Sequence, residues 1–166
     1  MATAKPGEVL VREAGSDDAA LLGRLIDAMD VHYNGAGNTS GVDKAADCAH
    51  LALQSQEGTR FLVAEVSSQP AGIACFAVIR PGRRLAGLIF LKDLFVVPDH
   101  RSRGVGRELM RALARYALER GIGRIDLTTD VANTGAQKLY EELGGARQMI
   151  LRYSFDTKTM RKLCHD

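Results

Sequence analysis

The stretch 95-FVVPDHRSRGVGRELM-110 joins an apolar run and a proline to arginines and two closely spaced glycines. The apolar run predicts the end of a buried strand, and the residues after the glycines have a helical apolar pattern. A glycine lacks a Cβ, so its backbone can adopt positive φ and let a ligand come close. The first N–H groups of a helix have no partners within it and carry the positive end of its dipole. The stretch therefore predicts a site for a phosphate or pyrophosphate.

The segments around this stretch indicate a single domain with alternating strands and helices. Their patterns predict strands at 8–14, 60–66, 71–79, 87–97 and 123–129, helices at 16–29, 43–54, 105–120 and 134–144, and one or two closing strands at 146–155. Residues 30–41 and 80–84 are expected to be loops, and residues 1–7 a loose tail. This order predicts an α/β (α+β) fold with a mixed sheet over residues 1–166.

The composition excludes several classes of protein. The chain of 166 residues is 46% apolar and 25% charged, with a net charge of +2, as expected for an ordinary globular domain. We expect no signal peptide and no membrane-spanning segment, because no apolar run is long enough. Cys48, Cys75 and Cys164 are too few and too widely spaced for a disulfide framework or a zinc site. We therefore expect reduced thiols, no metal and a cytoplasmic location.

Three ligands compete for the predicted anion site. A dinucleotide fold would need a third glycine where Leu109 stands, and a shorter turn than the one between Val97 and Gly104. A Walker loop needs Gly-Lys-Ser/Thr, which occurs nowhere in the chain. The third candidate is the pyrophosphate of coenzyme A.

Two motifs resemble those of a known superfamily. Residues 101-RSRGVG-106 resemble the [Q/R]-x-x-G-x-[G/A] signature of the GCN5-related N-acetyltransferases (GNAT). Residues 133-NTGAQKLYEELGGA-146 resemble a second GNAT element with an asparagine, an alanine and a tyrosine before Gly-Ala. The resemblance implies the GNAT fold, which has a central, mostly antiparallel sheet of six to seven strands flanked by about four helices.

The same resemblance implies a donor, a reaction and site residues. The donor is acetyl-CoA, and an amine attacks its thioester directly, without a metal. Tyr140 would protonate the departing thiolate, because a phenol of pKa near 10 matches that thiolate in basicity. Packing of its helix on the sheet is the alternative for Tyr140. The implied cofactor-binding residues are Leu94, Val96, Arg101, Ser102, Arg103, Gly104, Val105, Gly106 and Asn133.

Asp93 is the candidate for handling the acceptor amine. It interrupts the apolar strand 87–97, where a lone carboxylate is costly unless it has a role or a partner. Burial would raise its pKa toward that of a useful base. Alternatively, it binds the cationic amine, or pairs with an arginine or Lys92, although adjacent strand residues point to opposite faces.

The resemblance implies that the segment 30–43, between the first two helices, forms the acceptor wall. Its candidates for binding the amine or acting as a base are Asp30, His32, Tyr33 and Asp43, with His32 and Tyr33 as the expected substrate-binding residues. Histidine is the side chain type suited to proton transfer near neutral pH, although His32 also fits an ordinary surface histidine. The sequence of residues 92–106 is similar to that of the diamine (spermidine/spermine) acetyltransferase branch. That branch carries an acidic residue where this chain has Lys92, and a cation there disfavours a polycationic acceptor.

Other functions fit less well. Arginines at 103, 107, 111 and 115 share one helix face, but glutamates interleave and aromatics are few, so we expect no nucleic acid and no membrane partner. A non-catalytic acyl-CoA-binding or sensing module would need neither Tyr140 nor Asp93. We therefore predict an acetyl-CoA-dependent N-acetyltransferase acting on a primary amine of a small molecule or peptide. A homodimer is expected, because dimers are common in the superfamily and the apolar segment 146–155 could pair or exchange.

Overall fold

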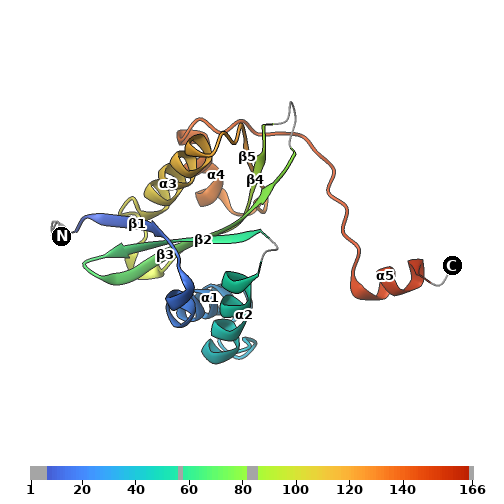
Figure 1. Cartoon of the computed structure of the whole chain (residues 1–166), viewed down its shortest axis with the longest axis horizontal. Coiled ribbons are helices and arrows are strands. Elements are labelled where there is room, and N and C mark those ends of the chain that lie inside the picture. Colours follow the sequence, from blue (N-terminus) through green and yellow to red (C-terminus); the bar gives the residue numbers. More distant parts are fainter. Residues whose placement is uncertain (1–6, 56–57, 82–85, 165–166) are drawn as a thin grey trace. The chain divides into compact units, whose positions relative to one another are not determined.

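The computed structural model describes residues 7–55, 58–81 and 86–164, shown in Figure 1. The chain forms two compact units, Met1–Asn133 and Thr134–Asp166. Most of the predicted tail at 1–7 and of the turn at 80–84 lies outside the described residues.

The first unit contains one sheet with the strand order β1-β2-β3-β4-β5. Its strands are β1 (Val9–Glu13), β2 (Thr59–Val66), β3 (Gln69–Ile79), β4 (Leu88–Val96) and β5 (Ile125–Leu127). The neighbours from β1 to β4 pair antiparallel, whereas β5 pairs parallel to β4. The mixed, mostly antiparallel sheet is therefore confirmed.

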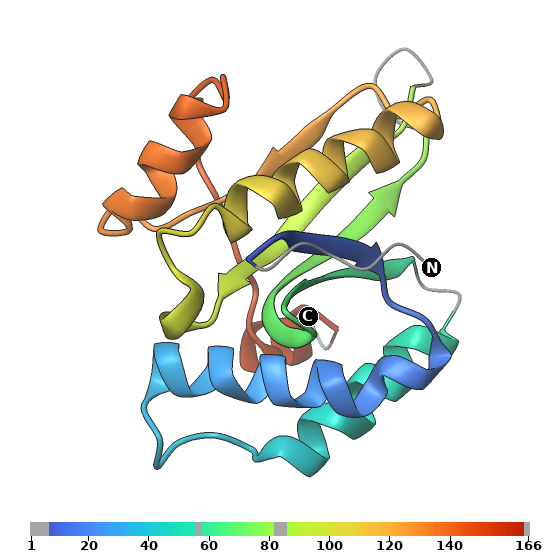
Figure 2. The ribbon, with the colours of Figure 1, turned by 90° about the vertical axis from the view of Figure 1, so that its left-hand side faces the viewer.

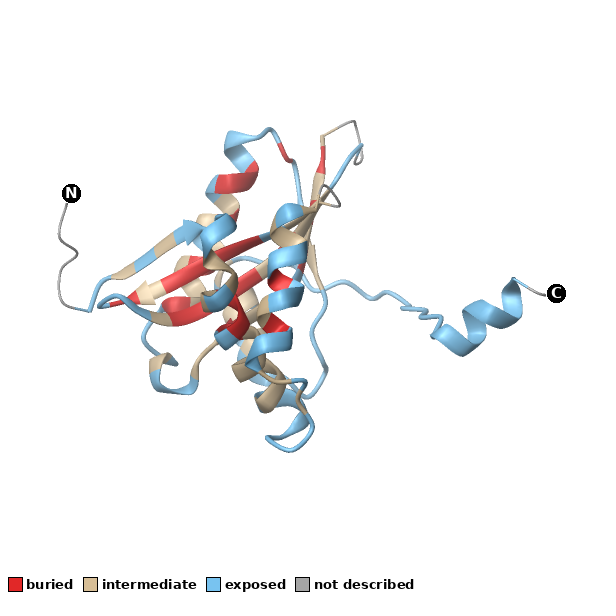
Figure 3. Cartoon of the chain, turned by 60° about the horizontal axis from the view of Figure 1, so that its bottom comes forward, coloured by how far each residue is buried: buried red, intermediate tan, exposed pale blue. Residues whose placement is uncertain are grey.

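Helices cover both faces of this sheet, as Figure 2 shows. On one face lie α1 (Ala19–Asn34), which follows a short 3₁₀ turn, and α2 (Val42–Gln54). On the other face lies α3 (Val105–Glu119), which buries Leu109 and Leu113 against the sheet. The buried residues follow the strands and the inner faces of the helices (Figure 3).

The first helix is longer than predicted. Residues 30–34 were expected in a loop, but α1 continues to Asn34 and ends at Gly35, where φ is +83°. Helices commonly end at a glycine with positive φ, since such a residue lacks the steric cost of a Cβ. The helix therefore includes His32 and Tyr33.

The second unit contains α4 (Thr134–Glu142) and α5 (Thr157–Leu163). The predicted strands at 146–155 are wrong, because this segment has no regular structure. A strand needs a neighbour for its backbone groups, and no described strand pairs with this segment. The described sheet consequently has five strands rather than six to seven. Large apolar side chains of the segment are exposed, namely Met149, Ile150, Leu151, Tyr153 and Phe155.

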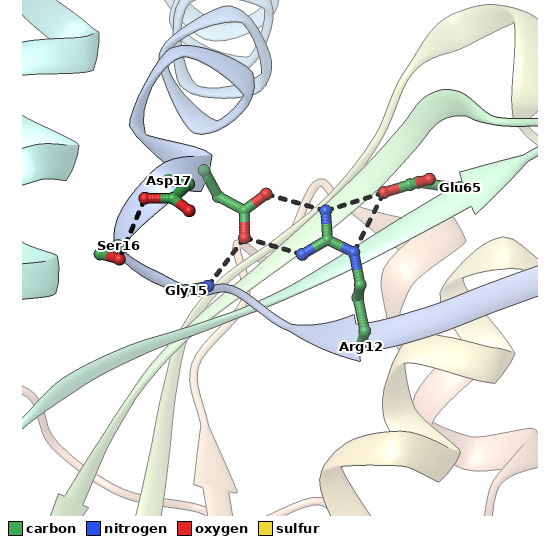
Figure 4. Close-up of polar contacts among 6 residues, drawn as sticks. Arg12, Gly15, Ser16, Asp17 and Glu65 are labelled. Carbon is green, nitrogen blue, oxygen red and sulfur yellow. Dashed lines mark hydrogen bonds and ion pairs between the residues drawn. The ribbon is translucent and has the colours of Figure 1, made fainter.

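An arginine in β1 ties the sheet to the start of α1 (Figure 4). Arg12 donates from Nη1 and Nη2 to the two carboxylate oxygens of Asp18, at 2.7 and 2.8 Å. It also donates from Nε and Nη2 to Glu65 in β2, at 3.2 and 3.0 Å. The hydrogen bonds from Arg12 hold the pKa of Asp18 below its usual value, and the N–H of Gly15 lowers it further.

We expect Arg12→Met to lower the free energy of unfolding by about 1–2 kcal/mol at neutral pH. Because the pKa of Asp18 is depressed in the folded state, this stabilisation is present above the unfolded pKa of about 3.9. It is lost as the pH falls through the lower folded value. Urea unfolding across a pH series measures the difference. Arg111→Met, which removes an exposed pair with Glu108, is the control and should cost less than about 0.5 kcal/mol. An equal loss in both variants, or one independent of pH, would contradict the assignment.

Candidate active site

A β-bulge in β4 shapes the candidate site. In the pairing with β3, Asp93 lies opposite Cys75 and Leu91 lies opposite Phe76, so Lys92 has no counterpart. An extra residue of this kind reverses the alternation of side chains along a strand. Leu91 thus packs in the core under α3, whereas Phe95 packs in the core under α1 and α2.

The bulge places Lys92 and Asp93 on the same face of the sheet. The Nζ of Lys92 lies 2.7 Å from the Oδ2 of Asp93. This hydrogen bond raises the pKa of Lys92 above its usual value, against partial burial, which lowers it. The ion pair with Lys92 was one of the alternatives for Asp93. The expectation that the two side chains point to opposite faces is wrong, because the bulge interrupts the alternation.

Both charged groups line a pocket of about 260 Å³ between the sheet and the helices α1 and α2. The other lining residues are Ile26, Met29, Cys48, Ala49, Thr59, Phe61, Ile73 and Cys75. The sequence alone did not identify these wall residues as functional, since buried apolar positions carry no signal that separates a pocket from a core. Burial and the nearby carboxylate of Asp93 raise the pKa of the Cys75 thiol to about 11. Cys75 is therefore protonated at neutral pH and is no nucleophile.

His32, one of the two predicted acceptor residues, lies beside β4. The ring of His32, in the last turn of α1, lies 5.9 Å from the ring of Phe95 and 5.2 Å from that of Tyr33. The side chains of His32 and Tyr33 are exposed. Neither is among the described residues that line the pocket with Asp93. His32 thus lies next to β4, the strand that carries Asp93, but outside the pocket that Asp93 lines.

One edge of β4 is open beyond the bulge. The parallel pairing with β5 ends at Leu91, so no described strand lies along residues 92–96 on that side. The N–H of Val97 donates to the carbonyl of Ala71 in β3 at 3.0 Å. Because peptide groups alternate along a strand, those of Leu94 and Val96 face the open edge. The carbonyl of Val96 already accepts a hydrogen bond from the Nε of Arg101, at 3.0 Å.

The loop after β4 turns sharply into α3. Residues Pro98–His100 form a 3₁₀ turn, and the N–H of Arg101 donates to the carbonyl of Pro98 at 3.1 Å. Ser102 and Gly104 follow with φ of +60° and +83°. A Cβ built on Gly104 would meet nothing within 4 Å, so the space before this residue is open.

Helix α3 begins directly after Gly104. The N–H groups of Gly104, Val105 and Gly106 therefore have no acceptor within the helix. Arg101 and Arg103 are exposed beside them and add positive charge. Because the amide of Arg101 is already bonded, the amides that fit a pyrophosphate are those that come after it. The geometry suits the anion predicted for this loop.

The remaining predicted residues lie at or beyond the boundary between the units. Asn133 is the last residue of the first unit, and its N–H donates to the carbonyl of Asp130 at 3.0 Å. Tyr140 lies half-buried in α4 of the second unit. The roles of both residues stay predictions. In the described part of the chain, no group of three or more His, Cys, Asp or Glu residues is placed to hold a metal ion. None of the described helices is long and apolar enough to cross a membrane.

The open edge of β4 and the glycine loop at the start of α3 together suit a ligand that carries a pyrophosphate. Residues 26–145 match the Acetyltransferase (GNAT) family, and the chain belongs to this family. It is an N-acetyltransferase in the general sense that the family and its relatives share.

Relatives and solved structures agree with this assignment. The chain is 28% identical to the uncharacterized N-acetyltransferase YhfO of Bacillus subtilis, over 81% of this chain and 87% of that protein. It is 31% identical to streptothricin acetyltransferase of Streptomyces lavendulae, but spans only 47% of that protein's length.

Two solved structures share the fold. An integron cassette protein from the mobile metagenome of V. cholerae has a TM-score of 0.86 at 25% identity, covering 95% of this chain and 98% of its own. Aminoglycoside N-acetyltransferase AAC(6')-Iy, solved with CoA, has a TM-score of 0.72 at 19% identity, covering 90% of this chain and 95% of its own.

Proposed function

We propose that this protein transfers the acetyl group of acetyl-CoA directly to a primary amine of a small molecule or peptide. The observation that carries the proposal is the open edge of β4, which leads into the glycine loop at the start of α3. Peptide groups of Leu94 and Val96 are suited to bind the pantetheine arm. The amides of Ser102 through Gly106 are suited to bind the pyrophosphate, with Arg101 and Arg103 supplying charge.

The proposed chemistry uses Asp93 on β4, His32 in α1, and Tyr140 and Asn133 as predicted from the resemblance. The free amine attacks the thioester carbonyl, a C–N bond forms, and the C–S bond breaks. Asp93 binds the ammonium form of the acceptor and takes its proton, directly or through water. His32 assists at the rim of the acceptor site. Tyr140 gives a proton to the departing CoA thiolate, and Asn133 contributes to holding the donor.

A panel assay tests this function. CoA release is followed with a thiol reagent while diamines, aminoglycosides, amino acids and peptide N-termini are supplied as acceptors. Acetyl-CoA affinity is measured separately by calorimetry. We expect amine-dependent release of CoA with at least one class of acceptor. Tight binding of acetyl-CoA without transfer to any amine would instead indicate the acyl-CoA-sensing module.

The active form is expected to be a cytoplasmic homodimer. Met149, Leu151, Tyr153 and Phe155 are large, apolar and exposed, as is Ile150. The two-residue spacing of the first four is typical of a strand that buries one face. A second copy is a suitable partner for such a segment, since exchange of an element between copies readily forms dimers.

We expect light scattering after size exclusion to give the mass of a dimer for the native chain. The double variant Leu151→Glu, Phe155→Glu should be monomeric at the same concentration, because two buried charges would oppose the pairing. Arg152→Glu, on the opposite face of the segment, should stay dimeric. A monomeric native chain, or a double variant that remains dimeric, would contradict the proposal.

A further inference from the structure

The pocket under β4 contains a matched pair of opposite charges. Lys92 and Asp93 are the only charged residues among the described residues that line it, and the remaining walls are mainly apolar. A ligand that complements this pocket therefore carries one cationic group, one anionic group and an apolar body. Polycations do not meet this requirement.

Both members of the pair are accessible to a ligand. The side chain of Asp93 is 23% exposed and that of Lys92 is 69% exposed, with 2.7 Å between Nζ and Oδ2. An acceptor ammonium that binds Asp93 takes the place of the Lys92 ammonium. The displaced Lys92 stays next to the bound amine and can then bind an anion. For an acceptor with further positive charges, the same lysine is repulsive.

We propose that Lys92 and Asp93 jointly recognise an α-amino acid with an apolar side chain as the acceptor. The inference rests on the proposed function and names the class of its substrate. The amine binds Asp93, the carboxylate binds Lys92, and the side chain enters the apolar part of the pocket between Phe61, Met29 and Ile73. During transfer the amine nitrogen forms the new bond to the acetyl carbon, and its surplus proton passes to Asp93. CoA leaves as the thiol after protonation of its sulfur.

Three acceptors separate the contributions of the two charges. Leucine has both groups, leucinol lacks the carboxylate, and 1,5-diaminopentane replaces it with a second cation. We expect the native protein to have a kcat/KM at least about 30-fold higher for leucine than for leucinol. Leucinol has no carboxylate, so it cannot form the charge-assisted hydrogen bond with Lys92. Transfer to the diamine should be weaker still. Calorimetry with CoA present should give the same order of affinities.

Variants at position 92 then test the lysine itself. Lys92→Met should abolish the preference for leucine over leucinol, and Lys92→Glu should shift the ratio of leucine to diamine by about 100-fold toward the diamine. The control Arg115→Glu makes the same change of charge at an exposed position on α3 and should leave both ratios unchanged. Thermal unfolding establishes that each variant is folded.

The possible outcomes separate the two proposals. Equal use of leucine and leucinol, or ratios unaffected by Lys92→Met and Lys92→Glu, would overturn the role of the pair while acetyl transfer itself stands. A native protein that acetylates the diamine better than leucine would also overturn the role of the pair. Binding of acetyl-CoA without transfer to any amine would overturn the proposed function, and this inference with it.

Discussion

Replacing Gly104 with valine is expected to weaken the binding of acetyl-CoA about 100-fold, which corresponds to about 2.7 kcal/mol. Gly104 has a φ of +83°, a conformation that is strongly unfavourable for a β-branched residue. Valine would therefore change the turn that aims the amides of Gly104 to Gly106. It would also place a side chain in the open space before the loop, where the pyrophosphate is expected. Isothermal titration with acetyl-CoA measures the loss.

A matched control lies at the other end of the same helix. Gly121 also has a positive φ, of +64°, and a Cβ built there meets nothing within 4 Å. Gly121→Val should therefore cost a similar amount of stability without lowering the affinity for acetyl-CoA. Retained affinity in Gly104→Val, or an equal loss in both variants, would show that the loop does not bind the pyrophosphate.

Replacing Tyr140 with phenylalanine is expected to lower kcat about 100-fold. This factor is at the lower end of the rate enhancement that a general acid typically provides. The phenyl ring preserves the packing of the half-buried side chain, so the affinity for acetyl-CoA should change little. The decisive measurement is the separation of kcat from KM for acetyl-CoA, together with the pH profile. The limb of the profile that reports the phenol should disappear in the variant.

Tyr116→Phe is the corresponding control, because Tyr116 packs in the core on α3 and has no predicted role in catalysis. It should leave kcat unchanged. If Tyr140→Phe turns over as fast as the native protein, the assignment of Tyr140 as the general acid is wrong. Tyr140 would then serve only to pack its helix. A rise in KM alone would point to donor binding instead.

Much of the backbone geometry around the predicted donor site could be predicted from the sequence because its determinants are local. The apolar run before Pro98, the glycine at the start of a helix and the amphipathic pattern after it each depend on neighbours along the chain. The structure has β4, the turn with positive φ at Gly104 and the helix α3 where these patterns indicated them. The bonds of Arg101 to Pro98 and Val96 were not predictable, because they depend on how the loop folds back.

The closing segment shows the opposite case. Residues 146–155 have the alternation of a strand, yet form none. Alternation measures only which side chains favour a common face, whereas a strand also requires a partner for its peptide groups. The partner is a property of the tertiary or quaternary structure.

The sequence by itself indicated the family through two motifs, predicted an anion-binding loop and placed an acid within an apolar strand, since each rests on residue type and spacing. Only the tertiary structure decided where that acid points. The pairing of β4 with β3 leaves Lys92 without a counterpart, and the resulting bulge puts Lys92 and Asp93 on one face of the sheet. Register between strands depends on contacts between residues far apart in the chain, so a rule for adjacent residues could not anticipate it.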